Sequence, residues 1–355
     1  MKRYLLLEDG NVFEGEAFGA SIDVSGELIF TTSPTGYLEV LTDPSYGGQI
    51  VLFAFPSVLT YNLRRSIPQS RDISASGVIV REASDLNTEA FRELDMLLNN
   101  SGVPGIKGVD TRKIIELIRK KGNMRGIISC TRNPENDFGT MNTRDLLRRF
   151  ATTFDYRINN DRNDEILFVD MGTKKSLLDQ VSKISSLHVV PFDFPFSTIN
   201  GGYSGIFLSN GPGDPSDESL DGVRELIRKN YGKLPIFGVC LGHQVLSMAL
   251  GASTGKMLYG HHGTNHSVIQ GEKCFITSHN HNFHVLEESL FGTPLEVIQR
   301  DANDGAVEMV ADSEKFAMSV QYHPEGSPGP VDPCNFFGEM KKAFGGVYAK
   351  NAWNK

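Results

Sequence analysis

The segment Gly238-Val-Cys-Leu-Gly-His-Gln244 decides the fold of the C-terminal part of this sequence. It has the form G-x-C-x-G, and it lies between an apolar run at 234–239 and a helical stretch that starts at Leu241. Glycines two residues either side of a nucleophile allow the sharp strand-to-helix turn called a nucleophile elbow. This turn exposes a side chain at the carboxyl end of a sheet, where ligand sites form in α/β proteins. The segment therefore predicts an α/β fold with Cys240 as its nucleophile.

The context of Cys240 favours a reactive role over a packing role. A free cysteine is among the most buried residue types, and for an isolated cysteine packing is the commoner role. Here the first N–H groups and the positive dipole end of the following helix point at the sulfur, which favours the reactive thiolate. The elbow pattern therefore predicts that Cys240 is a reactive residue and not a packing residue.

A nucleophilic cysteine needs a base, and His323-Pro-Glu325 is the best candidate among the nine histidines. It directly follows an apolar run at 316–321, and residues two apart in an extended chain point to the same side. An imidazole beside a carboxylate is the base-and-orienter arrangement of a catalytic triad. On its own this tripeptide would be interpreted as a solvated turn, but together with the elbow it predicts His323 as the base and Glu325 as its orienter.

The loop Ser209-Asn-Gly-Pro-Gly-Asp-Pro215 follows another apolar run. Such a loop can present backbone N–H groups to an oxyanion or a carboxylate. An ordinary turn explains its spacing equally well. It lacks the spacing of a P-loop or of a dinucleotide fingerprint, and no ATP site is recognisable in the sequence.

Outward from the elbow, short apolar runs alternate with amphipathic stretches. This alternation predicts crossover connections and a C-terminal, mostly parallel sheet flanked by helices. We expect strands at 166–170, 187–191, 205–209 and 234–239, and helices at 176–184 and 220–230. Four closely spaced strands, at 274–277, 295–300, 306–311 and 316–321, indicate an added antiparallel portion.

The first part of the sequence is β-rich, with expected strands at 27–32, 49–55 and 77–81 and expected helices at 88–99 and 110–121. A chain of 355 residues exceeds the usual single-domain size. The polar stretch 155–165 lacks apolar periodicity and is interpreted as a linker. We therefore expect a smaller mixed β-rich N-terminal domain at 1–155, an α/β domain at 165–345 and a poorly ordered tail at 346–355.

Composition excludes several classes of function. The net charge of -8 argues against nucleic-acid binding, which needs a basic face. No apolar run approaches the roughly 20 residues that span a bilayer. The four cysteines are scattered without C-x-x-C spacing, so neither a disulfide framework nor a zinc ribbon is predicted. We expect a cytoplasmic protein with no nucleic-acid or membrane partner.

Three motifs together resemble the signatures of the triad (class I) glutamine amidotransferases: the loop at 209–215, the elbow, and His323-Pro-Glu325. The rest of the chain narrows the resemblance to the small chain of carbamoyl-phosphate synthase. The segments that carry it are Thr35-Gly-Tyr-Leu-Glu-Val-Leu-Thr-Asp-Pro-Ser-Tyr46, Val109-Asp-Thr-Arg-Lys-Ile114, Gly260-His-His-Gly263 and Ser327-Pro-Gly-Pro330. The similarity covers nearly the whole sequence.

The resemblance implies a glutaminase subunit with a class I glutamine amidotransferase-like fold. Cys240 would attack the side-chain amide of L-glutamine and form a glutamyl thioester, supported by His323 and Glu325. The substrate-binding positions that the resemblance carries over are Ser45, Gly211, Gly213, Leu241, Gln244, Asn280, Asn282 and Phe283. The implied partner is a large ATP-grasp subunit that makes carbamoyl phosphate from bicarbonate, for pyrimidine or arginine biosynthesis. No cofactor is expected in this chain, and ATP with a divalent metal is expected on the large subunit.

Three segments depart from the family pattern, and we expect none of them to touch the triad. Asn280-His-Asn-Phe283 has Asn282 where the family has glycine, and asparagine is well tolerated if that position needs a positive φ. The other two are 55–63 and Asp170-Met-Gly-Thr-Lys-Lys-Ser176.

The histidines at 261, 262, 266, 279, 281 and 284 raise the question of a metal site. They lack H-E-x-x-H spacing and an accompanying acid or cysteine at ligand spacing, so we expect structural hydrogen bonds and no metal. Two other functions remain open. A glutaminase subunit serving another synthase would carry a different N-terminal domain. A non-catalytic regulatory homologue would have no chemical reason to keep Cys240, His323 and Glu325.

Overall fold

The computed structural model describes residues 1–58, 63, 66–83, 89–135, 137–159, 164–198 and 201–344. The chain forms two compact units. The first comprises Met1–Asn142 and Met257–Thr264, and the second comprises Thr143–Lys256 and Asn265–Lys355. The tail expected at 346–355 lies outside the described residues, as do residues 59–62 of the departing segment at 55–63.

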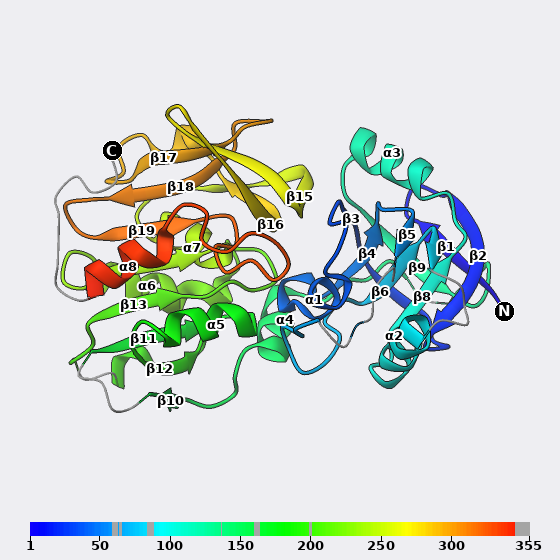
Figure 1. Cartoon of the computed structure of the whole chain (residues 1–355), viewed down its shortest axis with the longest axis horizontal. Helices are drawn as coiled ribbons and strands as arrows, with labels where there is room; N and C mark the ends of the chain where they lie inside the picture. The colour runs from blue at the N-terminus through cyan, green and yellow to red at the C-terminus, as the bar shows by residue number, and fades with distance from the viewer. Residues whose placement is uncertain are drawn as a thin grey trace. The chain divides into compact units, whose positions relative to one another are not determined.

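The N-terminal unit is a closed barrel in the strand order β1-β2-β8-β6-β4-β3-β9 (Figure 1). The strands are β1 Lys2–Leu7, β2 Val12–Gly19, β3 Val24–Thr31, β4 Gln49–Phe53, β6 Gly77–Val80, β8 Pro104–Lys107 and β9 Met124–Ser129. The β3, β4, β6 and β8 strands pair in parallel, and the remaining pairs are antiparallel. The expected strands at 27–32, 49–55 and 77–81 are confirmed, and the unit is mixed and β-rich as predicted.

Alternating side chains divide the barrel's apolar residues into two clusters. Leu5, Ile50 and Ile106 belong to one cluster, together with Ile114 and Ile118 of helix α3 (Thr111–Lys121). The other cluster packs the opposite faces of the strands against α1 (Tyr37–Thr42) and α2 (Glu89–Asn100). The short strands β5 (Ser57–Val58) and β7 (Glu82–Ala83) pair with each other. Asp110 caps α3 by accepting a hydrogen bond from the Lys113 amide.

The C-terminal unit contains a ten-stranded sheet in its described part, in the order β10-β12-β11-β13-β14-β19-β18-β17-β15-β16. The strands are β10 Tyr156–Ile158, β11 Glu165–Asp170, β12 Ser186–Pro191, β13 Gly205–Leu208, β14 Ile236–Val239, β15 Thr254–Gln270, β16 Lys273–Val285, β17 Glu296–Asp301, β18 Val307–Asp312 and β19 Ala317–Val320. Only the run from β12 to β19 is parallel. The sheet is therefore mixed and not mostly parallel, because the predicted antiparallel portion is larger than the four strands expected.

Helices cover both faces of this sheet (Figure 1). On one face, α5 (Lys175–Ser182) and α8 (Phe336–Phe344) share a cluster with Phe168, Phe207 and Phe237. On the other face, α4 (Thr143–Phe150), α6 (Asp221–Asn230) and α7 (Leu241–Ala249) pack on Leu167 and Ile206. Residues that follow one another along a strand, such as Leu167 and Phe168, thus pack on opposite faces of the sheet. This is expected for strands that are covered by helices on both sides.

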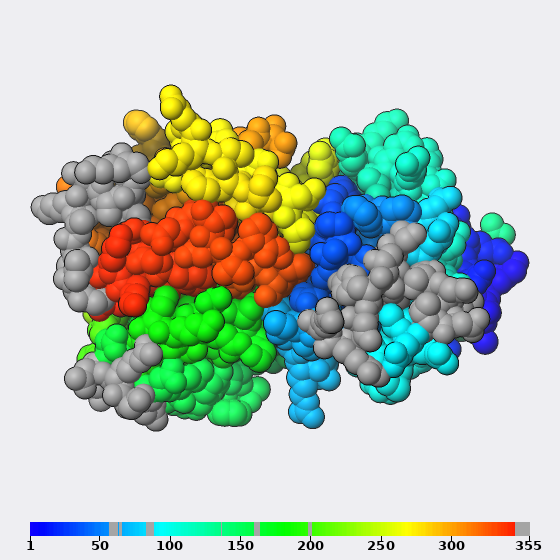
Figure 2. Space-filling view, viewed as in Figure 1, coloured from blue at the N-terminus to red at the C-terminus, as the bar shows by residue number. Residues whose placement is uncertain are grey.

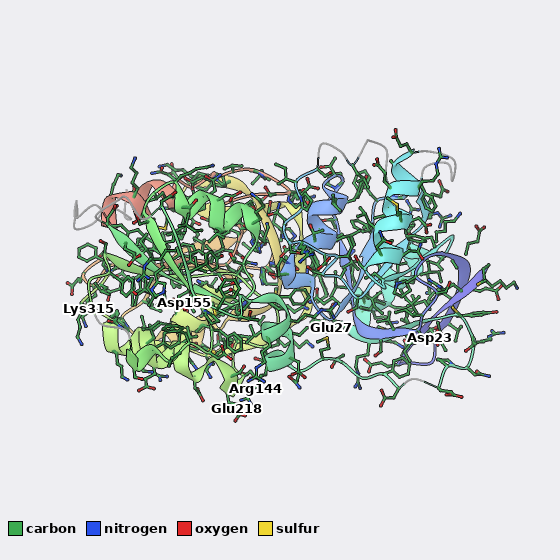
Figure 3. The ribbon with its side chains drawn as sticks, turned by 90° about the horizontal axis from the view of Figure 1, so that it is seen from below. Asp23, Glu27, Arg144, Asp155, Glu218 and Lys315 are labelled. Atoms are coloured by element: carbon green, nitrogen blue, oxygen red, sulfur yellow. The ribbon has the colours of Figure 1, made fainter. Side chains whose placement is uncertain are left out.

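The division between the units falls earlier in the chain than the linker expected at 155–165. Helix α4 packs within the second unit, where Arg144 pairs with Glu218 at 3.4 Å (Figure 3). Strand β10 lies inside the expected linker and pairs with β12. Strand β10 was not predicted from the sequence because the residues around it are polar. An edge strand of three residues also buries little apolar surface.

The described residues contain no helix that is both long and apolar enough to cross a membrane. Figure 2 shows that the described end of the chain, drawn in red, forms part of the C-terminal unit's surface between β15–β16, drawn in yellow, and the green segment that includes α5.

Candidate active site

Cys240 occupies the junction between β14 and α7. Its φ of 53° and ψ of -106° lie in a region that L-residues rarely adopt. A Cβ atom on Gly238 would lie 2.6 Å from the carbonyl oxygen of Gly242, and a Cβ on Gly242 would lie 2.3 Å from that of Leu208. Only glycine fits at both positions, so the strained elbow predicted from the glycine spacing is present.

The surroundings of the sulfur explain how the elbow directs it. Cys240 is the N-cap of α7, so the amide of Leu241 lies in the first helical turn, where N–H groups have no intrahelical acceptor. The Sγ atom lies 3.5 Å from the carbonyl oxygen of Asn280 on β16. Cys240 is 3% exposed, so the helix end acts on it in a largely water-free environment.

His323 and Glu325 meet as the sequence spacing predicts. Nδ1 of His323 lies 2.7 Å from Oε1 of Glu325, and both side chains are buried. Since the carboxylate only accepts, this contact holds the Nδ1–H tautomer and directs Nε2 away from Glu325. Within the described residues Nε2 makes no hydrogen bond, which leaves it available to the sulfur of Cys240.

The charges of His323 and Glu325 depend on burial, on their mutual contact and on two neighbours, Lys174 and Cys240. Burial alone would lower the pKa of His323, but the Glu325 carboxylate outweighs burial, and contact with Cys240 adds to the rise, so the pKa is raised. Burial alone would raise the pKa of Glu325, but Lys174 and His323 lower it well below its ordinary value. The imidazole therefore carries a proton at neutral pH, and the carboxylate is ionised.

Lys174 is a member of this site that the sequence analysis missed. Its side chain is 2% exposed, and Nζ lies 2.9 Å from Oε1 of Glu325 and 2.7 Å from the carbonyl oxygen of Gly326. The expectation that the segment 170–176 does not touch the triad is therefore wrong, and the contact of the Asn280 carbonyl oxygen with the Cys240 sulfur shows that it is also wrong for the segment 280–283. A lysine just beyond the carboxyl end of β11 was the available signal, because parallel strands bring such positions to one edge.

The loop at 209–215 lies beside the elbow. The amide of Gly242 donates to the carbonyl oxygen of Ser209 at 3.0 Å, which joins the loop to the start of α7. A Cβ on Gly211 would lie 2.0 Å from the carbonyl oxygen of Met171, and Gly213 has a φ of 103°. Both glycines are thus required by the backbone. The position beside Cys240 favours the ligand-binding interpretation of this loop over an ordinary turn.

Of the other expected glutamine-binding residues, five lie on α7 or β16. Nε2 of Gln244 donates to the carbonyl oxygen of Phe283 at 2.7 Å and to Oε1 of Gln321 at 2.9 Å. Asn280 and Asn282 are two apart on β16 and therefore face the same side. Asn282 is not among the residues with a positive φ, so this position does not require glycine.

Ser45 belongs to the N-terminal unit. It lies in the 3-10 helix η1 (Pro44–Tyr46), where its amide donates to Oδ1 of Asp43 at 2.9 Å. Ser45 is 5% exposed.

His243 follows Cys240 closely but has a different environment from His323. Burial lowers its pKa to about 3, and its Nδ1 is 2.9 Å from the hydroxyl of Ser319. It stays neutral, so it serves the packing of α7 and does not compete as the base.

The histidine-rich strand β16 approaches an acid that sequence spacing did not reveal. Oε1 of Glu308, on β18, lies 3.6 Å from Nδ1 of His279 and 3.9 Å from Nε2 of His281. The expectation that no acid accompanies these histidines is wrong. His266 pairs with Asp301 at 3.5 Å, whereas His261 and His262 belong to the N-terminal unit.

Comparisons with known proteins agree with this geometry. Residues 167–343 match the model of the class I glutamine amidotransferases, and residues 5–128 match that of the carbamoyl-phosphate synthase small chain, CPSase domain. A carbamoyl phosphate synthase small chain from Thermoplasma acidophilum is 40% identical over 346 residues, which cover 96% of this chain and 98% of the relative. The chain belongs to the carbamoyl-phosphate synthase small-chain family.

Other members of the family support the same assignment. The small chain of Bacillus caldolyticus is 41% identical, with 96% of each chain covered. A relative from Halalkalibacterium halodurans, a pyrimidine-specific small chain, is 40% identical and covers 96% of this chain and 97% of its own length. The protein is thus a glutamine-hydrolysing subunit of carbamoyl-phosphate synthase. The match at 5–128 favours this family over glutaminases that serve other synthases.

Proposed function

We propose that Cys240, His323 and Glu325 form the catalytic triad of this glutaminase. The observation that carries the proposal is the strained Cys240 at the elbow, beside a buried histidine that a carboxylate keeps protonated. An imidazolium beside the sulfur favours the thiolate, which is the nucleophilic form of cysteine. Lys174 acts through Glu325, so it is a positioning residue and not a member of the triad.

In the acylation step, the Cys240 thiolate attacks the side-chain carbonyl carbon of L-glutamine. The amide N–H groups of Gly211 and Leu241 are the proposed donors that stabilise the oxyanion of the tetrahedral intermediate. The carbon–nitrogen bond then breaks as His323 gives its proton to the leaving nitrogen. The products are ammonia and a glutamyl thioester on Cys240.

In the hydrolysis step, the now neutral His323 takes a proton from water. The resulting hydroxide attacks the thioester, and the thiolate leaves to give glutamate. The imidazolium and the thiolate are thereby restored. Glu325 stabilises the protonated imidazole in both steps without accepting a proton, as its lowered pKa supports.

Glutamine is proposed to bind through residues around the elbow. Backbone groups of Gly211, Gly213 and Leu241 would hold its polar ends, and Gln244 would contribute through its amide, which two hydrogen bonds hold in place. Asn280, Asn282 and Phe283 on β16 complete the proposed set within the C-terminal unit. Ser45, which belongs to the N-terminal unit, stays a prediction of the family resemblance.

The partner proposed for this chain is a large ATP-dependent subunit that makes carbamoyl phosphate from bicarbonate. Ammonia released into water becomes ammonium, which has no nucleophilic lone pair, so delivery to a partner is advantageous. Glutamine hydrolysis by a Cys–His–Glu triad needs no cofactor in this chain, and ATP with its divalent metal would reside on the large subunit. A cytoplasmic location, with the product used for pyrimidine or arginine synthesis, fits this role.

Replacement of Cys240 by serine tests the triad. We expect Cys240→Ser to lose glutamine hydrolysis to background while its thermal midpoint and its binding to the large subunit stay near those of the wild type. A matched control is Cys334→Ser, a half-buried cysteine outside the site. Glutaminase activity that survives in Cys240→Ser would overturn the proposal.

A further inference from the structure

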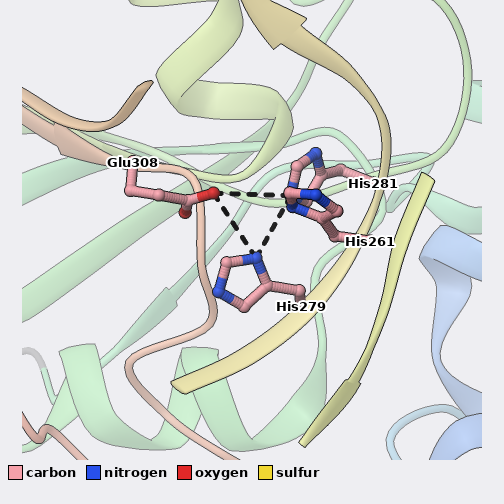
Figure 4. Close-up of side chains that lie close together, drawn as sticks. All are labelled: His261, His279, His281 and Glu308. Atoms are coloured by element: carbon pink, nitrogen blue, oxygen red, sulfur yellow. Dashed lines mark hydrogen bonds and ion pairs between the residues drawn. The ribbon is translucent and has the colours of Figure 1, made fainter. Parts of the chain in front are cut away.

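The side chains of His279, His281 and Glu308 form a second polar cluster in the C-terminal unit, which we call the β16–β18 cluster (Figure 4). The three side chains are 3%, 5% and 0% exposed. The two strands are not neighbours in the sheet, since β17 and β15 separate them in the strand order. No ladder hydrogen bond therefore explains why these side chains meet.

Three atoms of the cluster form a nearly regular triangle. Nδ1 of His279, Nε2 of His281 and Oε1 of Glu308 are separated by 3.2, 3.6 and 3.9 Å. A triangle with these sides has a centre that is about 2.1 Å from each atom, which is the length of a zinc–nitrogen or zinc–carboxylate bond, about 2.0–2.2 Å. The atoms are thus already spaced as ligands around one small cation.

In each imidazole, the nitrogen that points away from this centre, which we call the outer nitrogen, makes a hydrogen bond of its own. That hydrogen bond determines whether the inner nitrogen, which faces the centre, carries a lone pair. Nδ1 of His281 lies 2.9 Å from the carbonyl oxygen of Phe283, which only accepts, so Nδ1 carries the hydrogen. The hydroxyl of Thr277 donates to the carbonyl oxygen of His266 at 3.2 Å, so its oxygen accepts from Nε2 of His279 at 2.7 Å. Both inner nitrogens therefore present lone pairs to each other and to a carboxylate.

Three converging acceptors repel one another unless a metal ion or a shared proton lies between them. Hydrogen bonds from the outer nitrogens to a carbonyl and a hydroxyl are the usual second shell of metal-bound histidines. Two imidazoles and one carboxylate are the donors that zinc prefers, whereas calcium and magnesium prefer sites made of oxygen alone.

We propose that the β16–β18 cluster binds one zinc-type divalent ion through His279, His281 and Glu308. The ion joins β16 to β18 within the C-terminal unit, and a fourth ligand completes a tetrahedral sphere. Asn280, whose carbonyl oxygen is near the Cys240 sulfur, lies between the two histidine ligands on β16. The role of the ion is structural, since the proposed hydrolysis proceeds without it.

Metal binding by the purified full-length chain tests the site directly. The chain is stripped with a chelator and titrated with cobalt(II) and with zinc(II). We expect one ion per chain, a cobalt spectrum typical of tetrahedral coordination, and a higher thermal midpoint with zinc, because an ion that binds the folded state stabilises it. Wild-type protein that binds less than a tenth of an ion per chain after reconstitution would overturn the proposal.

Variants distinguish a bound metal ion from a proton shared among the three acceptor atoms, which could also hold them together. His279→Gln and Glu308→Gln should weaken metal binding at least 100-fold, and Thr277→Val should weaken it roughly 10- to 100-fold through the second shell. His188→Gln is the matched control, because His188 is a buried histidine of the same unit that pairs with Asp155. Equal affinity in wild type and Thr277→Val, or a zinc-insensitive midpoint in the wild type, would show a proton-linked cluster and overturn the proposal.

Discussion

The C-terminal unit contains two buried groups of histidine and carboxylate that differ in what balances their charge. At the triad, Glu325 contacts one histidine, and the ammonium of Lys174 lies 2.9 Å from it. In the β16–β18 cluster, Glu308 approaches two histidines whose inner nitrogens are turned toward each other. The first group has its cation built into the chain, and we infer that the second obtains its cation from solution.

This difference separates a reactive site from a structural one. A protein-borne cation beside Glu325 leaves Nε2 of His323 available for proton transfer. Lone pairs that converge on one point are suited instead to hold an ion still. Strand β16 contributes to both groups, since residues 280 and 282 face one side and 279 and 281 face the other.

The largest expected effect is the loss of the base. His323→Asn should lower glutamine hydrolysis by about 10²- to 10⁴-fold, because general acid–base catalysis contributes that much. Initial rates of ammonia release measure the effect. The control His188→Asn removes a buried histidine far along the sheet and should retain activity within a few-fold. Similar losses in both variants would contradict the special role of His323.

The next largest effect is expected at Lys174, whose ammonium group is the cation beside Glu325. Lys174→Met leaves Glu325 buried without its ammonium partner, and we expect the free energy of unfolding to fall by about 3 kcal/mol. The neighbouring Lys175 is exposed and pairs with Asp179 on the surface, so Lys175→Met should cost about 1 kcal/mol or less. Denaturant unfolding of both variants checks the difference, and equal values would show that the buried pair has no special weight.

The pH dependence of stability sharpens the same comparison. The raised pKa of His323 stabilises the fold below about 6.5, and this contribution is lost as the pH rises toward the folded-state value. The lowered pKa of Glu325 stabilises it above about 4.5, and this contribution is lost as the pH falls. The stability difference between the wild type and Glu325→Gln should therefore be widest between these two values and narrow on either side. A difference that does not change with pH would contradict the assigned charges.

The smallest effect is expected in the β16–β18 cluster. In chelator-treated protein, Thr277→Val should lower the free energy of unfolding by about 1 kcal/mol, the net value of a typical hydrogen bond. With zinc present the deficit should grow, because the ion stabilises the wild type more. An unchanged deficit would argue against the metal.

The sequence predicts those parts of the site that depend on local backbone chemistry. The elbow follows from two glycines and a strand-to-helix change, and the His323–Glu325 contact follows from a two-residue spacing. The long strands β15 and β16 are less predictable, because their polar and histidine-rich residues lack clear alternation. Glu308 could not be paired with His279 from spacing, because only the tertiary fold brings β18 to β16.

Lys174 and β10 illustrate a second reason why parts of the structure could not be predicted from the sequence. Lys174 is an ordinary residue type in a loop, and only its burial against Glu325 reveals its role. The three residues of β10 are held by pairing with β12 and not by apolar periodicity. In both cases a partner distant in the sequence supplies the interaction.

The central claim is that Cys240 forms a glutamyl thioester. The mass of the peptide that contains Cys240, measured during turnover, tests it most directly. Wild-type protein mixed with glutamine, quenched in acid within the first turnovers and digested should carry one glutamyl group on the peptide that contains Cys240. The modification should be absent in Cys240→Ser. A glutamyl group on another residue, or steady glutamine hydrolysis with Cys240 never modified, would contradict the account.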